Sequence, residues 1–242
     1  EVRRLGHAVI YGDTDSLFVD VLAAEESEAL RRAEEIRVAL GAMLVQRLRE
    51  EFGLESFLEL EFEKCYRRFF MPEVRGGTGG SKKRYAGLVG DGAGDAVEFV
   101  GLEAVRRDWT PVARRGQREL LDLVFHDRPV EDFIRAFLAE LRAGRFDGLL
   151  SYKKAVRKQL AEYTRTTPAH VKAARKLNGP ASRIVEYVMT TAGPEPIEAR
   201  AAALDYEHYV ERQIEPLADA VLRFLSIRFG DVIGRARQLE LL

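Results

Sequence analysis

The 242-residue sequence has little cysteine, little histidine and no long apolar run. Its single cysteine, Cys65, excludes an internal disulfide and is typical of a reducing compartment. No apolar run is long enough to span a bilayer and no secretory signal is visible, so we expect no membrane partner. The four histidines are scattered without metal-ligand spacing. Because the chain starts at Glu1 and a strand pattern follows almost at once, we expect it to be part of a longer cytoplasmic protein.

Charge is distributed unevenly along the chain. The formal net charge is −1, which by itself argues against a polyanionic partner. Residues 64–88, however, contain seven positive side chains and one negative one, and residues 151–183 contain nine and one. Two basic segments in a nearly neutral chain predict a surface that binds nucleic acid. The alternative is an ordinary solvated charged surface.

The most informative motif is Tyr11–Ser16, Tyr-Gly-Asp-Thr-Asp-Ser, which lies between two short apolar runs. This pattern predicts a β-hairpin with two carboxylates at its tip. Side chains alternate along a strand, so Asp13 and Asp15 can project to the same side and hold a hard cation such as Mg²⁺ beside a phosphate. A solvated turn is the alternative. Two enzyme classes use such a pair: two-metal nucleotidyl transferases and glycosyltransferases that hold a sugar nucleotide through a metal.

The first part of the chain is predicted to mix one long helix with antiparallel strands. Apolar residues recur at helical spacing over Glu25–Phe52, which predicts an amphipathic helix whose apolar side packs on a sheet. Strict alternation of apolar and acidic residues predicts a strand at Phe57–Glu63. Two further strands are predicted at Lys83–Leu88 and Ala96–Gly101, the first of them after a glycine-rich loop.

From Asp108 onward the pattern changes from strands to helices, so we place a domain boundary near Arg107. Thr110 suits a helix N-cap and Pro111 the first helical position. The predicted fold class is α+β, an antiparallel sheet with a packed helix, followed by a mainly helical domain. The elements predicted in the second part are helices at 111–125, 130–143, 168–177 and 206–227, a basic extended or irregular run at 152–163, and a strand at 183–191.

Taken in order, these motifs resemble those of family B DNA polymerases. A wider string, from Arg68-Phe69-Phe70-Met71-Pro72 through the glycine-rich loop, is most similar to bacterial members. The resemblance implies a palm at residues 1–107 and a mainly helical thumb at 108–237. The motifs that carry it are 11–16 (catalytic hairpin), 60–64 (the acidic strand beside it), 81–87 (the Lys-Lys-x-Tyr motif that holds the primer–template duplex), 101–103 with 106–109 (the palm-to-thumb transition), and 168–174 with 205–209 (thumb segments).

The activity implied by the resemblance is template-directed DNA synthesis. A primer 3′-hydroxyl would attack the α-phosphate of a deoxynucleoside triphosphate with the help of two Mg²⁺ ions. Asp13 and Asp15 are the catalytic and metal-binding residues implied, with Asp15 as the direct ligand and Asp13 in support. Glu61 and Glu63 would hold an accessory ion or balance nearby lysines. The family's other palm aspartate and its fingers lysine have no counterpart here, so we expect the isolated chain to be inactive.

The resemblance also implies which basic and aromatic residues contact DNA. Those near the primer end would touch the duplex minor groove, and those on the thumb would contact backbone phosphates without reading sequence. A DNA polymerase of this kind would act in the bacterial cytoplasm, associated with the nucleoid. The residues implied are Lys82, Lys83, Arg84 and Tyr85 near the primer end, and Tyr152, Lys153, Lys154, Arg157, Lys158, Arg165, Lys172 and Arg175 on the thumb.

The last five residues, 238–242, resemble the peptide with which bacterial polymerases dock on a sliding clamp. Gln238 would hydrogen-bond at the rim of a pocket, while Leu239, Leu241 and Leu242 would fill an apolar groove. A frayed chain end is the alternative.

Two other function classes explain less of the sequence. A glycosyltransferase would not need the basic segments, and a non-catalytic nucleic-acid-binding module would not need the acidic hairpin.

Overall fold

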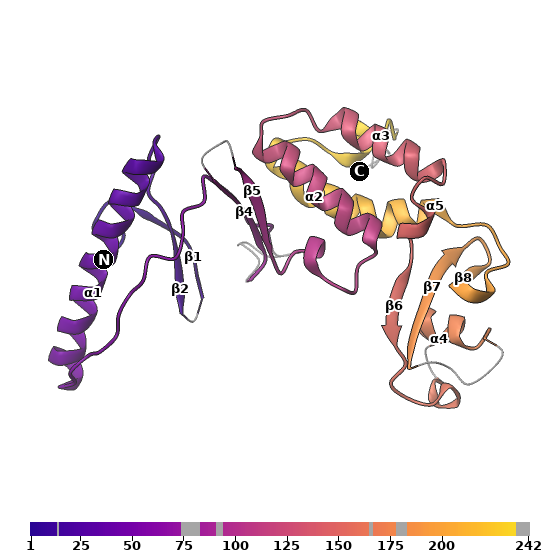
Figure 1. The fold of residues 1–242 in the computed structure, drawn as a ribbon, viewed down its shortest axis with the longest axis horizontal. Coiled ribbons are helices and arrows are strands. Elements are labelled where there is room, and N and C mark those ends of the chain that lie inside the picture. Colours follow the sequence, from indigo (N-terminus) through magenta and orange to yellow (C-terminus); the bar gives the residue numbers. More distant parts are fainter. Residues whose placement is uncertain (14, 74–82, 91–93, 165–166, 178–182, 236–242) are drawn as a thin grey trace, which may run out of the picture. The chain divides into compact units, whose positions relative to one another are not determined.

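The computed structural model of the protein describes residues 1–13, 15–73, 83–90, 94–164, 167–177 and 183–235 (Figure 1). The chain forms two compact units, Glu1–Glu98 and Phe99–Leu242, called here the N-terminal unit and the C-terminal unit. This division lies a few residues before Arg107, near which the sequence analysis places the domain boundary. In the described residues, no helix has the length and apolar character needed to cross a membrane.

The N-terminal unit begins with the predicted hairpin. Strands β1 (Ala8–Asp13) and β2 (Ser16–Asp20) are antiparallel, with Asp13 opposite Ser16 and a register irregularity between Val9 and Tyr11. The register places the two aspartates of the motif at the connection between the strands, Asp13 as the last residue of β1 and Asp15 in the turn. The hairpin prediction is therefore confirmed.

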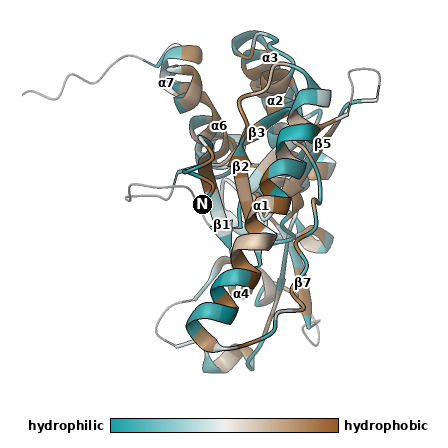
Figure 2. Cartoon of the chain, turned by 90° about the vertical axis from the view of Figure 1, so that its left-hand side faces the viewer, coloured by the Kyte–Doolittle hydropathy of each residue, from teal (hydrophilic) through white to brown (hydrophobic). Residues whose placement is uncertain are grey.

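The long helix is also confirmed, as α1 (Glu26–Phe52), but its packing is looser than predicted. It ends at Gly53, whose φ of 65° lets its own N–H donate to the carbonyl of Arg49 and the N–H of Leu54 donate to that of Leu48. Only Ala29 and Ile36 are buried along α1, while Leu30 and Val38 are 40% and 55% exposed. Figure 2 shows hydrophobic and hydrophilic residues side by side along this helix.

The predicted strand at Phe57–Glu63 does not form, and this part of the prediction is wrong. The segment has no regular secondary structure, and Phe57 and Leu58 are 90% and 64% exposed. Alternation in a sequence defines two faces, but a strand also needs a partner for its backbone hydrogen bonds. Here one backbone carbonyl, that of Leu60, instead accepts a hydrogen bond from the Arg37 side chain at 3.1 Å.

A second antiparallel sheet follows, with strand order β3-β4-β5. Strand β4 confirms the strand predicted at Lys83–Leu88, although it begins two residues later, at Tyr85. Strand β5 confirms the strand predicted at Ala96–Gly101. The sequence analysis missed β3, because three residues are too short to show a periodicity. The strands are β3 (Arg68–Phe70), β4 (Tyr85–Val89) and β5 (Ala96–Val100).

The C-terminal unit combines helices with a three-stranded antiparallel sheet of order β6-β7-β8 (Figure 1). The predicted helices at 111–125 and 130–143, the strand at 183–191 and the short helix at 168–177 are confirmed with shifts of a few residues at their ends. Strand β8 was not predicted, since its Gly-Pro-Glu-Pro sequence has poor strand propensity. The elements are α2 (Pro111–Phe125), α3 (Glu131–Arg142), β6 (Tyr152–Ala155), α4 (Ala169–Ala174), β7 (Ile184–Thr190), β8 (Gly193–Pro196), α5 (Tyr206–Tyr209), α6 (Glu215–Leu222) and α7 (Phe229–Val232), with short 3₁₀ turns at Glu103–Val105, Asp147–Leu149, Leu160–Glu162, Ile197–Ala199 and Arg223–Leu225.

The single helix predicted at 206–227 is interrupted by a π-helix, Val210–Ile214. Pro216 lacks the N–H that would bond to the carbonyl of Arg212 in an α-helix, so that carbonyl needs another donor. The Gln213 side-chain amide supplies it at 3.0 Å. The Gln213 side-chain oxygen accepts from the hydroxyl of Thr110 at 3.0 Å, which joins the π-helix to the N-cap of α2.

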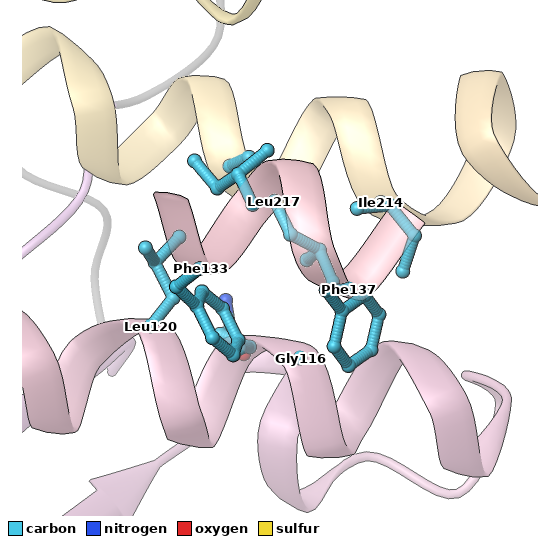
Figure 3. A pocket seen from close by; sticks show the side chains of 9 residues that line it. Gly116, Leu120, Phe133, Phe137, Ile214 and Leu217 are labelled. Atoms are coloured by element: carbon cyan, nitrogen blue, oxygen red, sulfur yellow. The ribbon is translucent and has the colours of Figure 1, made fainter. Parts of the chain in front are cut away.

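The helices of the C-terminal unit enclose a well-packed apolar core. Gly116 on α2 lets the ring of Phe137 on α3 approach closely, because a Cβ at this glycine would lie 3.2 Å from the Phe137 ring (Figure 3). The cavity at this junction is only about 20 Å³, also bordered by Ile214 and Leu217. This volume leaves room for at most one water, so this cavity is no site for a small organic ligand.

Candidate functional site

The tip of the β1–β2 hairpin is linked to the residue that precedes β4. The Asp13 carboxylate forms an ion pair with the Lys83 ammonium at 3.0 Å. The backbone N–H of Lys83 also donates to the Tyr11 hydroxyl at 2.9 Å, although these two residues are 72 positions apart in the chain. Both ends of Lys83 are thus fixed to β1, and its backbone adopts a left-handed conformation with φ of 56°.

This ion pair organises the charges of the hairpin. The hydrogen bond and the negative charge of Asp13 raise the pKa of Lys83, and the nearby Asp15 adds a smaller effect in the same direction. The Lys83 side chain is 70% exposed, while that of Asp13 is 22% exposed. Asp15 lies exposed in the turn. The two carboxylates therefore differ, since Asp13 is held by a cation and Asp15 faces solvent.

The donor set at this tip fits a magnesium ion that also binds a phosphate. Mg²⁺ is commonly held by one or two carboxylates, with water and substrate phosphate oxygens as its remaining ligands. Asp13 and Asp15 meet that requirement. Within the described residues no three or more Asp, Glu, His or Cys side chains are grouped to hold a metal, so Glu61 and Glu63 do not complete such a group here. Both are exposed in the irregular segment after α1.

A cluster of aromatic rings supports the hairpin on the β3–β4 strands. The ring of Phe18 on β2 lies 5.1 Å from that of Tyr85 and 5.3 Å from that of Phe69, measured between centroids. Tyr66 belongs to the same cluster and donates a hydrogen bond to Glu98 at 3.1 Å. Gly87 on β4 is required beneath it, because a Cβ there would lie 2.1 Å from the Tyr66 ring. This packing fixes the hairpin relative to Lys83.

The DNA-contact residues predicted near the primer end have different environments. Lys83 is at the hairpin, as described above. Tyr85 packs in the aromatic cluster, and Arg84 is half-buried. Lys82 lies outside the described residues. The sequence analysis identified Tyr11 as part of a motif but missed its role, which only the hydrogen bond to Lys83 reveals.

In the C-terminal unit, three of the predicted DNA-contact residues are engaged within the protein. Tyr152 is buried, with its ring 5.2 Å from that of Tyr187 and its hydroxyl 3.0 Å from the His208 imidazole. Lys153 forms an ion pair with Glu186 at 3.0 Å. The Arg175 guanidinium donates to the backbone carbonyls of residues 160 and 163, at 2.8 and 3.1 Å. Their direct contacts with DNA stay predictions.

The other predicted basic residues of this unit present a different picture. Lys154, Arg157, Lys158 and Lys172 are exposed, and none has an ion pair in the part of the chain that the structure describes. Arg165 lies outside the described residues. The structure thus separates basic side chains that hold the fold together from those that face solvent without an ion pair among the residues it describes.

Comparison with known proteins identifies the family. The family model described as "DNA polymerase family B" matches residues 2–223. The chain belongs to DNA polymerase family B. Among its relatives, DNA polymerase II of Escherichia coli is 40% identical over 244 residues, covering 96% of this chain and 31% of that protein. DNA polymerase 2 of Aeropyrum pernix is 30% identical over 262 residues, covering 98% of this chain and 28% of that protein.

A solved structure supports the same conclusion. The family B DNA polymerase of the hyperthermophilic archaeon Pyrobaculum calidifontis matches 94% of this chain and 28% of its own chain, with a TM-score of 0.60 and 27% identity. The predicted α+β class and the expected similarity to bacterial members of the family are both confirmed. The chain spans about a third of the length of these polymerases. Family membership argues against the glycosyltransferase alternative.

Proposed function

We propose that this chain supplies the metal-binding hairpin and part of the duplex-binding surface of a template-directed DNA polymerase. The observation that carries the proposal is the geometry of the hairpin. Two carboxylates lie at its tip, and a lysine from the Lys-Lys-Arg-Tyr stretch reaches one of them at 3.0 Å. Metal ligands and a duplex-contacting residue would therefore act at the same place, as synthesis at a primer end requires.

In this proposal the two aspartates have different tasks. Asp15, exposed in the turn, is the direct ligand of Mg²⁺. Asp13 is restrained by Lys83 and supports the site. Two bound Mg²⁺ ions would supply the charge that activates the primer 3′-hydroxyl and stabilises the pyrophosphate that leaves the deoxynucleoside triphosphate. Glu61 and Glu63 remain proposed ligands of an accessory ion.

Lys83 would connect the metal site with the duplex. A lysine ammonium has three N–H donors. The ion pair with Asp13 uses one of them, so others remain for acceptors on DNA. Purine N3 and pyrimidine O2 atoms in the minor groove are acceptors common to all correct base pairs. Lys83 can therefore contact the primer end without reading its sequence.

The division of labour along the chain is part of the same proposal. Residues 1–107 would belong to a palm and residues 108–237 to a thumb that holds the duplex through backbone phosphates. Such contacts provide affinity and salt dependence but little sequence preference. Association with the bacterial nucleoid would follow from this DNA binding.

A graft into a complete polymerase tests the proposal. The chain would replace the region of E. coli DNA polymerase II to which it is 40% identical, and primer extension would be measured with and without Mg²⁺. We expect Mg²⁺-dependent synthesis by the chimera and none by the 242-residue chain alone. Extension by the chain alone would contradict the proposal that its two carboxylates need a further metal ligand.

Residues 238–242 would dock the polymerase on a sliding clamp, and they lie outside the described residues. The proposal rests on their sequence alone, with Gln238 at a pocket rim and Leu239, Leu241 and Leu242 in an apolar groove. A peptide of residues 233–242 should bind the bacterial clamp in calorimetry, and a scrambled peptide of the same composition should not. Equal binding of the two peptides would contradict this role.

A further inference from the structure

Tyr11 is the first residue of the hairpin motif but has no task in the metal site itself. Its ring packs against that of Phe18, its partner across the hairpin, with 5.6 Å between centroids. The register irregularity of the hairpin lies between Val9 and Tyr11, and a bulge of this kind re-aims the side chains beside it. Tyr11 and Asp13 are two residues apart on β1, so their side chains lie on the same face. The face of β1 that carries a metal-binding aspartate therefore also carries the Tyr11 hydroxyl.

Two side chains of this face hold Lys83 at its opposite ends. The Tyr11 hydroxyl accepts a hydrogen bond from the Lys83 backbone N–H at 2.9 Å, and the Asp13 carboxylate pairs with the Lys83 ammonium at 3.0 Å. The φ of Lys83 is 56°, a left-handed conformation that residues with a Cβ rarely adopt. Such a conformation persists where neighbouring contacts enforce it, and the hydrogen bond to Tyr11 is one of those contacts. Loss of that bond would let the backbone of Lys83 relax and would move its side chain.

Tyr66 provides an internal comparison, because it is a second tyrosine of the same aromatic cluster. Its ring lies 6.4 Å from that of Phe18, and its hydroxyl donates a hydrogen bond to Glu98 at 3.1 Å. The rings of both tyrosines serve packing. Their hydroxyls have different partners, since that of Tyr11 holds Lys83 and that of Tyr66 holds Glu98. The two hydroxyls can therefore be removed separately, and only the first removal acts on Lys83 directly.

We propose that Tyr11 is a positioning residue that fixes Lys83 for the recognition of a correctly paired primer end. Minor-groove acceptors occupy common positions in all correct base pairs, and a mispair displaces them. A lysine held at both its backbone and its ammonium reaches those common positions but does not follow a displaced acceptor. Tyr11 therefore favours extension of matched over mismatched primer ends without itself touching DNA. This inference rests on the proposed polymerase function, with Lys83 as a contact at the primer end.

The test is extension of matched and mismatched primer ends by the chimera described above. The quantity compared is the discrimination ratio, which is kcat/KM on the matched primer divided by kcat/KM on the mismatched primer. Tyr11→Phe keeps the ring and removes only the hydroxyl. Loss of one hydrogen bond corresponds to a factor of about 3 to 10, so Tyr11→Phe should lower kcat/KM on the matched primer, and with it the ratio, by that factor. Lys83→Met removes the ammonium itself and should lower the ratio at least as much.

Further variants separate positioning from a general effect on packing. In a Lys83→Met background, Tyr11→Phe should not lower the discrimination ratio further, because Tyr11 acts through Lys83. Tyr66→Phe is the matched control, which removes the other hydroxyl of the cluster and should leave the ratio unchanged. A second readout needs neither DNA nor metal. In the 242-residue chain, hydrogen exchange at the Lys83 amide should be faster in Tyr11→Phe and unchanged in Tyr66→Phe.

The outcomes separate this inference from the function on which it rests. A chimera that does not extend primers would overturn the proposed function, and this inference with it. If the chimera extends primers but Tyr11→Phe and Tyr66→Phe have the same discrimination ratio, only the positioning role of Tyr11 is wrong. That role is also wrong if Lys83→Met keeps the original ratio, or if Tyr11→Phe lowers the ratio equally with and without the Lys83 ammonium.

Discussion

Gly87→Ala should destabilise the N-terminal unit, although the same change in most strands is mildly favourable. The φ angle of Gly87 is not in the left-handed region, and alanine in a strand loses less conformational entropy on folding than glycine does, so backbone effects alone predict a gain of about 0.4–1 kcal/mol. Sterics predict the opposite. The new Cβ would lie 2.1, 2.4 and 2.6 Å from three atoms of the Tyr66 ring.

The size of the effect follows from what holds that ring. Ordinary contact needs about 3.4 Å or more, so the Tyr66 ring must move by more than 1 Å. It is packed against Phe69, with 5.7 Å between ring centroids, and its hydroxyl is bonded to Glu98. Overpacking of this kind costs about 1–3 kcal/mol, and loss of the hydrogen bond adds about 1 kcal/mol. We expect a loss of about 2–4 kcal/mol in the free energy of unfolding.

Hydrogen exchange and tryptophan fluorescence can measure this loss in the unit concerned. Exchange of the β4 amides in a urea series reports on the N-terminal unit, while the single tryptophan, Trp109, reports on the C-terminal unit. Gly87→Ala should change the exchange of the β4 amides and leave the unfolding reported by Trp109 unchanged. In a Tyr66→Ala background, Gly87→Ala should cost less than about 1 kcal/mol, because all three clashing ring atoms are gone. An equal cost in both backgrounds, or a stabilised β4 in the first, would refute the steric explanation.

Two further predictions concern other polar contacts. Gln213→Leu leaves the carbonyl of Arg212 and the hydroxyl of Thr110 without their partner, which should cost about 2–4 kcal/mol in urea unfolding followed by tryptophan fluorescence. The hydrogen bond from Lys64 holds the pKa of Glu98 below its ordinary value near 4.5. This contribution to stability is fully present above that ordinary value and is lost as pH falls through the lowered pKa, so Glu98→Gln should flatten the acid limb of the stability profile. An unchanged acid limb would show that Glu98 does not contribute.

Local signals explain which elements could be predicted from sequence. The hairpin, α1 and α2 have their determinants within a few residues, such as the turn motif, the apolar spacing, and Thr110 with Pro111 at a helix start. The strand predicted at Phe57–Glu63 does not form, because strand formation depends on a distant partner strand that the local pattern does not contain. The single α-helix predicted at 206–227 is interrupted in its middle by the π-helix. Pro216 cannot donate a backbone hydrogen bond to the carbonyl of Arg212, and the Gln213 side chain donates in its place.

The residues of the candidate site also divide into those that local sequence could identify and those that it could not. Asp13 and Asp15 could be identified from adjacent residues, because their spacing already brings two carboxylates to one turn. The contact of Lys83 with Tyr11 joins residues 72 positions apart, so no local pattern could indicate it.

The most direct test of the polymerase function compares two aspartates of the same hairpin in the chimera described above. Asp15→Asn removes the proposed metal-ligating charge, whereas Asp20→Asn removes a carboxylate at the far end of β2 that caps the N–H of Leu22. Primer extension and duplex affinity would be measured for both. We predict that Asp15→Asn lowers turnover by at least about 10²-fold without weakening duplex binding, and that Asp20→Asn retains near-normal turnover. Near-normal turnover of the Asp15→Asn chimera would contradict the central claim.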